Sequence, residues 1–314
     1  MNTTLSNVVI SIVPFKENGD IDEELYRAQL RRLSDAGCSV YVAGSASSEA
    51  NTFTPEEMDR VLAISYEELQ GKVPYRAMGC EPRHAGEMVR FMRQVERSGI
   101  ETAQIFSLDI GHGYKPSEAE LELYYSTVID STSLRIFLSC HPRSIGFALP
   151  IDMIERLCNR YPQITGIAYG GLDLSYLAEL IHRLGDRLEI HNAGPAIAVN
   201  TLSLGGNGFM GTEGNVAPTL VRSVITSWEA KDYEGLRNSY GKLMRLAKIL
   251  SRSGGGGLRS TKPIMNAFGL PGGHLRPPRL PIGSEDASAR VRDIVALDIP
   301  GFPQPLSPGL PLTE

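Results

Sequence analysis

Three histidines are the residues whose type and position most suggest chemistry. His112, His141 and His191 fall where short, β-rich apolar runs of the sequence end. Because histidine titrates near neutral pH, each could give or take a proton as a general acid or base. Gly111 and Gly113 flank His112, which indicates a loop with unusual backbone angles. A structural hydrogen bond within a loop is the alternative role for each histidine.

Neighbouring groups add further hypotheses. Cys140 precedes His141 and could act as a nucleophile. Adjacent residues on a strand point to opposite faces, so the thiol and the imidazole would not face each other, and a buried, inert cysteine is the default. Tyr114 could reach into the same pocket or pack within its loop. The three histidines with Glu49 or Asp109 could bind a divalent metal, yet no spacing supports such a site. We therefore predict neither a metal nor a cofactor.

The elements that position these residues alternate regularly. Helical periodicity fills the intervals between eight short apolar runs, and Thr54-Pro55-Glu56-Glu57 is a capping box that starts one helix. This alternation predicts a (β/α)₈ TIM barrel with parallel strands. A doubly wound open sheet is the alternative, but no Gly-x-Gly-x-x-Gly follows the first run. The predicted strands cover residues 8–13, 39–43, 73–78, 102–107, 134–139, 164–168, 188–192 and 208–210.

A helical extension follows the barrel. Helices are predicted over residues 227–251, 258–268 and 284–296, with a run of four glycines between the first two. We predict a single domain over residues 1–296, including the C-terminal helices from about residue 227. Residues 297–314 form a Pro-rich tail that we expect to be extended or disordered.

Composition limits the function. The chain has 314 residues, 42% of them hydrophobic, and a net charge of −5 without a basic cluster, which argues against nucleic acid as a partner. No apolar run is long enough to span a bilayer, and the N-terminus does not resemble a secretory signal. The four cysteines are scattered. We expect reduced thiols in a cytoplasmic protein.

Five strings of residues, in order along the chain, resemble the dihydrodipicolinate synthase / N-acetylneuraminate lyase family. The resemblance runs over roughly residues 8–296 and implies a TIM barrel, a small 2-keto acid substrate, and assembly as a homodimer or homotetramer. The strings are Pro14-Phe15-x-x-Asn18-Gly19-x-Ile21-Asp22, Glu49 with Phe53-Thr54-Pro55-Glu56-Glu57, Tyr114-Lys115-Pro116-Ser117, Gly205 to Met210 with Asn215 and Pro218, and Lys262 through Gly269-Leu270-Pro271-Gly272-Gly273 to Pro278.

The resemblance also shows what has been lost. In the family, a lysine at the end of strand six attacks the 2-keto acid to form a Schiff base. The matching segment here is Gly-Ile-Ala-Tyr, which places Ala168 at the lysine position. None of the seven lysines lies between Pro116 and Ala230, the stretch that contains the last four strands. Arginine is too basic to replace lysine in this reaction.

Other positions implied by the resemblance have changed as well. The family's strand-five tyrosine, a proton relay, corresponds to Ser139, and the arginine just after that strand corresponds to Ser144. The threonine that bonds to the tyrosine corresponds to Ala46. The tyrosine that a neighbouring subunit donates falls at His112 or Gly113. The combined loss indicates natural divergence from the Schiff-base mechanism.

One implied feature persists in the loop after the second strand. The family's Gly-Thr-Thr-Gly-Glu loop corresponds to residues 45–49, where Ser47 and Ser48 could still bind a substrate carboxylate through hydroxyl and backbone N–H groups. Glu49 completes the loop.

Two classes of function remain. The first is an enzyme, a lyase acting on a carboxylate-bearing, 2-keto-acid-like substrate through an enolate and without a Schiff base. The second is a non-catalytic ligand-binding or regulatory member of the family. The candidate catalytic residues are His112, Tyr114, Ser139 and His141, and the candidate substrate-binding residues are Ser47, Ser48, Glu49, Ala168, Tyr169, Asn192 and Met210.

Overall fold

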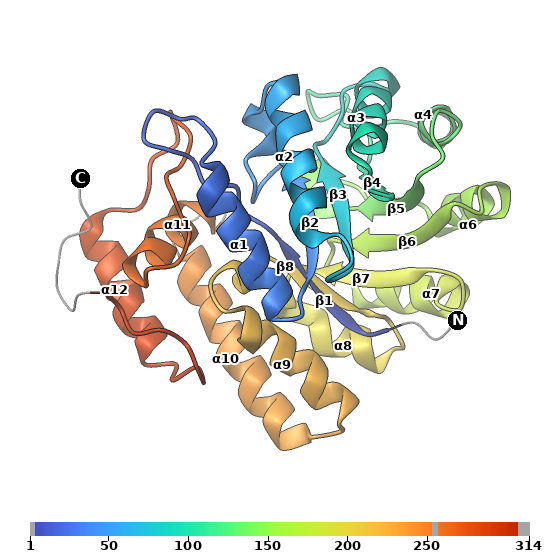
Figure 1. Ribbon diagram of the computed structural model, residues 1–314. Helices are drawn as coiled ribbons and strands as arrows, with labels where there is room; N and C mark the ends of the chain where they lie inside the picture. Colours follow the sequence, from blue (N-terminus) through green and yellow to red (C-terminus); the bar gives the residue numbers. More distant parts are fainter. Residues whose placement is uncertain (1–3, 253–256, 307–314) are drawn as a thin grey trace.

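Eight parallel strands close into a barrel, which confirms the predicted TIM fold (Figure 1). The computed structural model describes residues 4–252 and 257–306. Each strand pairs with its neighbours in chain order, and the last strand closes the ring on the first. The strands are β1 (Ser6–Ile10), β2 (Ser39–Gly44), β3 (Tyr75–Gly79), β4 (Thr102–Ile105), β5 (Arg135–Cys140), β6 (Ile164–Tyr169), β7 (Glu189–Ala193) and β8 (Gly208–Gly211).

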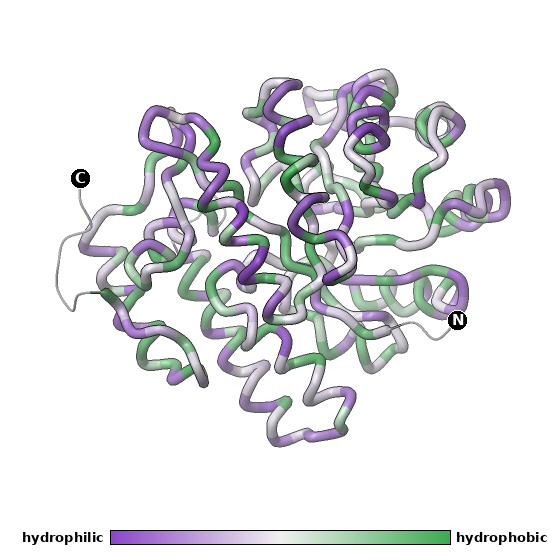
Figure 2. Tube along the Cα trace, viewed as in Figure 1, coloured by the Kyte–Doolittle hydropathy of each residue, from purple (hydrophilic) through white to green (hydrophobic). Residues whose placement is uncertain are grey.

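Helices cover the outside of the barrel. The capping box predicted at Thr54 is present, and a second one at Ser117 starts the helix after β4. Apolar residues run through the strands and along the inner sides of the helices (Figure 2). The helices between strands are α1 (Glu23–Asp35), α2 (Pro55–Leu69), α3 (Ala85–Ser98), α4 (Glu118–Ile129), α5 (Pro142–Ile145), α6 (Ile151–Arg160), α7 (Leu174–Leu184), α8 (Ala198–Ser203) and α9 (Pro218–Glu229), with 3₁₀ turns η1 (Ala50–Thr52), η2 (Pro195–Ile197) and η3 (Glu213–Asn215).

Three further helices form a C-terminal layer against the barrel (Figure 1): α10 (Tyr233–Ser251), α11 (Leu258–Ala267) and α12 (Ser284–Val295). The predicted helix over residues 227–251 was wrong at its start. Lys231 adopts a left-handed φ of 56°, and the Asp232 carboxylate accepts a hydrogen bond from Gly235 N at 2.9 Å. This turn ends α9 and caps α10. Most of the glycine run that separates α10 from α11 lies outside the described residues.

The first strand lies earlier in the chain than predicted. Barrel pairing covers Ser6–Ile10 rather than residues 8–13. Ile12 packs instead in a second apolar core with Phe209, Leu243 and Ile264, between the barrel and the C-terminal layer. Residues just after β1 therefore connect the barrel to the C-terminal helices.

The described part of the Pro-rich tail packs on α11. Phe302 and Phe268 form an edge-to-face pair at 4.8 Å, and Leu306 N donates to Ala267 O at 2.9 Å. Residues 307–314 lie outside the described chain. In the ranges that the structure covers, no helix is both long and apolar enough to cross a membrane.

Candidate functional site

The ends of β5 and β6 place Ser139 and Ala168 inside the barrel. Cys140 Sγ lies 3.3 Å from the hydroxyl of Tyr176 on α7, and the Tyr169 ring stacks on the Tyr176 ring at 4.8 Å, so these two strand residues face outward. Successive strand residues alternate between faces, so the preceding residues, Ser139 and Ala168, point inward.

Ser139, Ala168 and His191 form a row across three neighbouring strands. Ser139 pairs in register with Ala168, and Ala168 pairs with His191. Ser139 is 2% exposed and Ala168 4%, and the Ser139 hydroxyl has no partner among the described residues. A polar hydroxyl without a partner in the described chain therefore stands beside Ala168.

His141 follows Cys140 directly after the end of β5. Its Nδ1 lies 2.7 Å from the Ser144 hydroxyl, which fixes the ring orientation. The ring packs tightly on Gly170, where an added Cβ would come within 2.0 Å of the imidazole. Burial lowers the pKa of His141, and the nearby Glu81 charge only partly opposes this effect. The lowered pKa favours the neutral imidazole near pH 7, and in the tautomer whose Nδ1–H donates to Ser144, Nε2 is free to accept a proton.

His112 and Tyr114 lie in the loop between β4 and α4. The flanking Gly111 and Gly113 have the positive φ angles expected, and His112 itself has φ 52°. Both side chains are exposed, Tyr114 to 72%, and neither makes a hydrogen bond to another described residue. The structure does not bring them into contact with Ser139 or His141.

The loop after β2, over residues 45–49, has one hydroxyl without a partner in the described chain. Ser48 Oγ accepts from Gly44 N at 2.9 Å and donates to Ser11 O at 2.7 Å, so Ser48 braces the loop internally. Ser47 is buried, and its hydroxyl has no partner within the described chain. Glu49 adopts a left-handed φ of 58° and turns its carboxylate away toward the C-terminal layer. Ser47 is thus the side chain available to a ligand.

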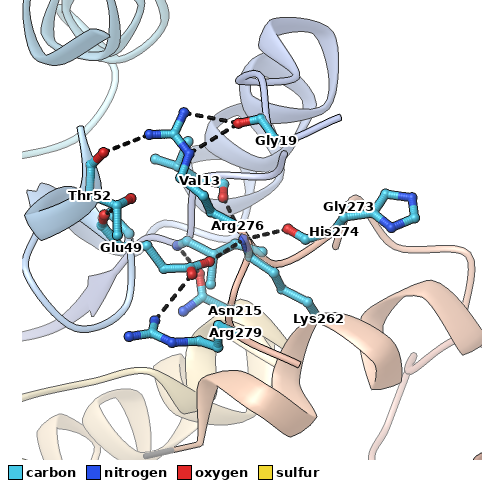
Figure 3. Close-up of polar contacts among 12 residues, drawn as sticks. Val13, Gly19, Glu49, Thr52, Asn215, Lys262, Gly273, His274, Arg276 and Arg279 are labelled. Carbon is cyan, nitrogen blue, oxygen red and sulfur yellow. Dashed lines mark hydrogen bonds and ion pairs between the residues drawn. The ribbon is translucent and has the colours of Figure 1, made fainter. Parts of the chain in front are cut away.

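Glu49 forms a fully buried ion pair with Lys262 of α11 (Figure 3). Lys262 Nζ donates to Glu49 Oε1, Val13 O and His274 O, each at 2.8 Å, and lies 4.4 Å from the Phe15 ring centroid. Burial lowers the pKa of Lys262 to about 8 even though Glu49 opposes that effect. All three N–H groups of the ammonium therefore have acceptors within the protein.

Two arginines extend this contact into a latch, by which we mean Glu49, Lys262, Arg276 and Arg279 (Figure 3). Arg279 Nη1 donates to Glu49 Oε2 at 3.1 Å. Arg276 donates to Glu57 Oε2 and to Thr52 O, both at 2.8 Å, and also to Gly19 O. The latch therefore joins the C-terminal segment to the loops after β1 and β2.

Three predicted binding residues divide between the two faces of the barrel. The Tyr169 hydroxyl bonds to the backbone of Asp173, and Asn192 accepts from Thr201 at 2.8 Å. Both side chains face outward and have structural partners. Met210 pairs with Ala193 and faces inward. The geometry thus keeps Met210 near the candidate site and separates Tyr169 and Asn192 from it.

Two carboxylates at the strand ends were missed in the sequence. Glu213, just after β8, accepts a hydrogen bond from Thr212 N at 3.0 Å and has no ion-pair partner in the described chain. Burial raises the pKa of Glu213. Glu81 follows Cys80 after β3, and its charge partly opposes the lowering of the His141 pKa by burial. An acidic residue two positions after a strand was the available signal in both cases.

Other chemistry is less well supported by the geometry. Cys140 Sγ accepts from Leu149 N at 3.4 Å, and burial raises the pKa of this thiol, so it is not an activated nucleophile. Residues 4–252 and 257–306 bring no three metal-binding side chains together.

Comparison with known proteins gives consistent matches over most of the chain. The model of the dihydrodipicolinate synthetase family matches residues 4–297. A 4-hydroxy-tetrahydrodipicolinate synthase of Methanopyrus kandleri is 26% identical over 272 residues, covering 86% of this chain and 88% of the relative. The structure of the enzyme of that name from Methylacidiphilum fumariolicum superposes with a TM-score of 0.84 at 21% identity, covering 94% and 96% of the two chains. CdNal of Clostridium difficile, solved with mannosamine, gives a TM-score of 0.83 at 18% identity, covering 93% and 99%.

Proposed function

We propose that this chain, which belongs to the dihydrodipicolinate synthetase family, is a lyase that acts without a Schiff base. Its substrate is a small, carboxylate-bearing, 2-keto-acid-like molecule, and its intermediate is an enolate. The observation that carries this proposal is the inward pair of Ser139 and Ala168 at the ends of β5 and β6, with His141 directly after β5. Ser139 offers a hydrogen-bond donor and His141 a base near the position where the family would place an amine.

Each group proposed for the site has a defined role. His141 Nε2 removes the proton next to the carbonyl, and Ser144 holds the ring through Nδ1. The Ser139 hydroxyl donates a hydrogen bond to the oxygen on which negative charge develops. Ser47 and the backbone of its loop bind the substrate carboxylate. Glu213, whose pKa burial raises, gives its proton to a hydroxyl on the next carbon, so that the enolate collapses, the C–O bond breaks and water leaves.

The remaining candidates take supporting roles. Ala168 and Met210 line the site, and Ser48 and Glu49 shape the loop that carries Ser47. Tyr169 and Asn192 support β6 and β7 from outside the barrel. His112 and Tyr114 act only if their exposed loop folds over the bound substrate.

Proton exchange tests this function. Purified protein is mixed with 2-keto acids in D₂O, and deuterium incorporation at C3 is followed by proton NMR. We expect protein-dependent exchange that falls at least about 100-fold in His141→Gln and drops in Ser139→Ala. His182→Gln changes an exposed histidine on α7 and serves as the matched control. Loss of exchange in the control as well would remove His141 from its role.

Borohydride trapping tests the absence of the Schiff base separately. Reduction of a lysine imine with pyruvate would add a fixed mass to the protein. We expect no such adduct under conditions in which exchange occurs. An adduct on any lysine would overturn the enolate mechanism and leave an ordinary Schiff-base aldolase.

A non-catalytic, ligand-binding protein is the second candidate. The small exposure of Ser139 and Ala168 favours it, because a closed site admits substrate poorly. Line broadening of a 2-keto acid without any exchange would support this function. We also propose a cytoplasmic homodimer or homotetramer, and light scattering on the eluted protein measures its mass directly.

A further inference from the structure

A cavity of about 450 Å³ opens at the N-terminal end of the barrel, opposite the candidate active site. Its wall combines the C-terminal ends of α2 and α3 with residues near the start of β3 to β7, including Thr102 of β4, Arg135 of β5, Thr165 of β6 and Glu189 of β7. Cavities of this size hold small molecules in many proteins. The barrel therefore has a second candidate site that the proposed function does not use.

A buried ion pair lines this cavity. Arg76 Nη2 donates to Glu189 Oε1 at 2.9 Å, with side-chain exposures of 7% and 28%. The guanidinium lies 3.8 Å from the centre of the Phe137 ring. Although burial pushes the pKa of Glu189 up, His191 and Arg76 bring it below its usual value, so the carboxylate is charged. Both charges are present near neutral pH.

The hydrogen bonding of this pair is incomplete. Arg76 Nη1 is buried and makes no well-aligned hydrogen bond among the described residues, although the nearby Tyr41 hydroxyl interacts with the guanidinium and raises the pKa of Arg76. An unmet donor on a buried cation is costly, whereas TIM-barrel cores are usually filled with branched apolar side chains. A charged pair that only filled the end of the barrel core would be expected to have all its hydrogen-bond donors paired.

The charges around the cavity indicate the class of ligand. Arg135 and Glu101 form a second ion pair at the rim, at 2.8 Å. A simple anion would meet two carboxylates, and a simple cation would meet two guanidinium groups. A molecule with an ammonium and a carboxylate a few bonds apart matches both kinds of group at once.

We propose that the N-terminal mouth of the barrel binds a small zwitterion of the amino-acid class. Its carboxylate lies toward Arg76 and its ammonium toward Glu189, while the Phe137 and Tyr75 rings contact its side chain. The proposal does not depend on the chemistry at the opposite end of the barrel.

Methyl NMR of the intact protein tests the site without any variant. Threonine methyl groups are labelled, and the L-amino acids are added one at a time, with acetate and methylammonium as singly charged probes. We expect shifts at Thr102 and Thr165, which line the cavity, with at least one amino acid and neither control. Thr52 and Thr212, at the other end, should not move. The proposal is overturned if no amino acid shifts these signals, or if acetate alone shifts them equally.

Substitutions in the cavity wall and at its rim test which side chains contribute to the affinity for the amino acid. Arg76→Met should weaken the amino acid that binds by about tenfold or more, because a charged hydrogen bond is lost. Since that change also removes a buried pair, Arg135→Gln with Glu101→Gln provides a second test on two exposed rim side chains and should weaken binding several-fold. Lys248→Met, on the exposed face of α10, is the control. Unchanged affinity in both the Arg76 and the rim variants would contradict the assignment.

Discussion

Two buried ion pairs stand at opposite ends of this barrel, and they differ in how completely they are satisfied. Lys262 and Glu49 are both fully buried, and every N–H of the lysine has an acceptor. Arg76 and Glu189 are partly open to a cavity, and one nitrogen of the arginine makes no well-aligned hydrogen bond in the described chain. The first arrangement has the properties of a structural joint, and the second has those of a binding site.

Of the substitutions compared, replacing Lys262 is expected to lower the free energy of unfolding most. Lys262→Met leaves Glu49 as a buried carboxylate supported only by Arg279, so we expect a loss of about 3–5 kcal/mol in the free energy of unfolding. Urea denaturation measures it, with Lys248→Met as the control expected to stay within about 0.5 kcal/mol. Equal stability of the two variants would show that the latch does not contribute to the stability of the fold.

The pH dependence of stability tests the buried His191, which lies close to Glu189 at the N-terminal end of the barrel. Burial lowers the pKa of His191 from 6.5 to about 4, so the folded state binds this proton less readily than the unfolded state does. Stability is therefore lost as the pH falls from about 6.5 to about 4, by about 3 kcal/mol in total. Urea denaturation across this range should show a shallower slope in His191→Gln. An unchanged slope would assign the acid sensitivity to other groups.

Removing Arg76 should cost less than removing Lys262. Arg76→Met exposes Glu189 to a cavity in which water can solvate the carboxylate, so we expect a loss of about 1–3 kcal/mol. Urea denaturation of both variants in one buffer gives the comparison directly. A cost as large as that of Lys262→Met would mean that the N-terminal pair is also a structural joint.

The smallest effect on stability is expected at the exposed loop after β4. Tyr114→Phe removes a hydroxyl without a partner in the described chain, so the free energy of unfolding should change by less than about 0.5 kcal/mol. Any loss of deuterium exchange in this variant would then report a catalytic role for the loop. A stability loss above 1 kcal/mol would instead indicate that Tyr114 packs against something in solution.

The sequence predicted the barrel because each strand and helix carries a local pattern. The capping box at Thr54, the apolar runs and their spacing were sufficient to find all eight strands. The end of β1 was misplaced because an apolar run does not show which residues pair with β8 and which pack elsewhere, as Ile12 does. The break at Lys231 was missed because a left-handed lysine has no sequence signature.

The candidate site was less accessible from the sequence. Tyr169 and Asn192 were grouped with Ala168 because strand ends were known, while the inward or outward phase of each residue was not. The N-terminal cavity depends on Arg76 meeting Glu189, 113 residues apart, which no local pattern encodes. Proposals about individual site residues therefore rest on the geometry.

The latch has a consequence for how the chain is made on the ribosome. Glu49 is synthesised 213 residues before Lys262. Similarly, β1 can pair with β8 only after nearly the whole barrel has been synthesised. Until α11 leaves the exit tunnel, the Glu49 carboxylate has no ammonium to bury against and must stay hydrated. The loop that carries Ser47 therefore reaches its final shape only near the end of translation.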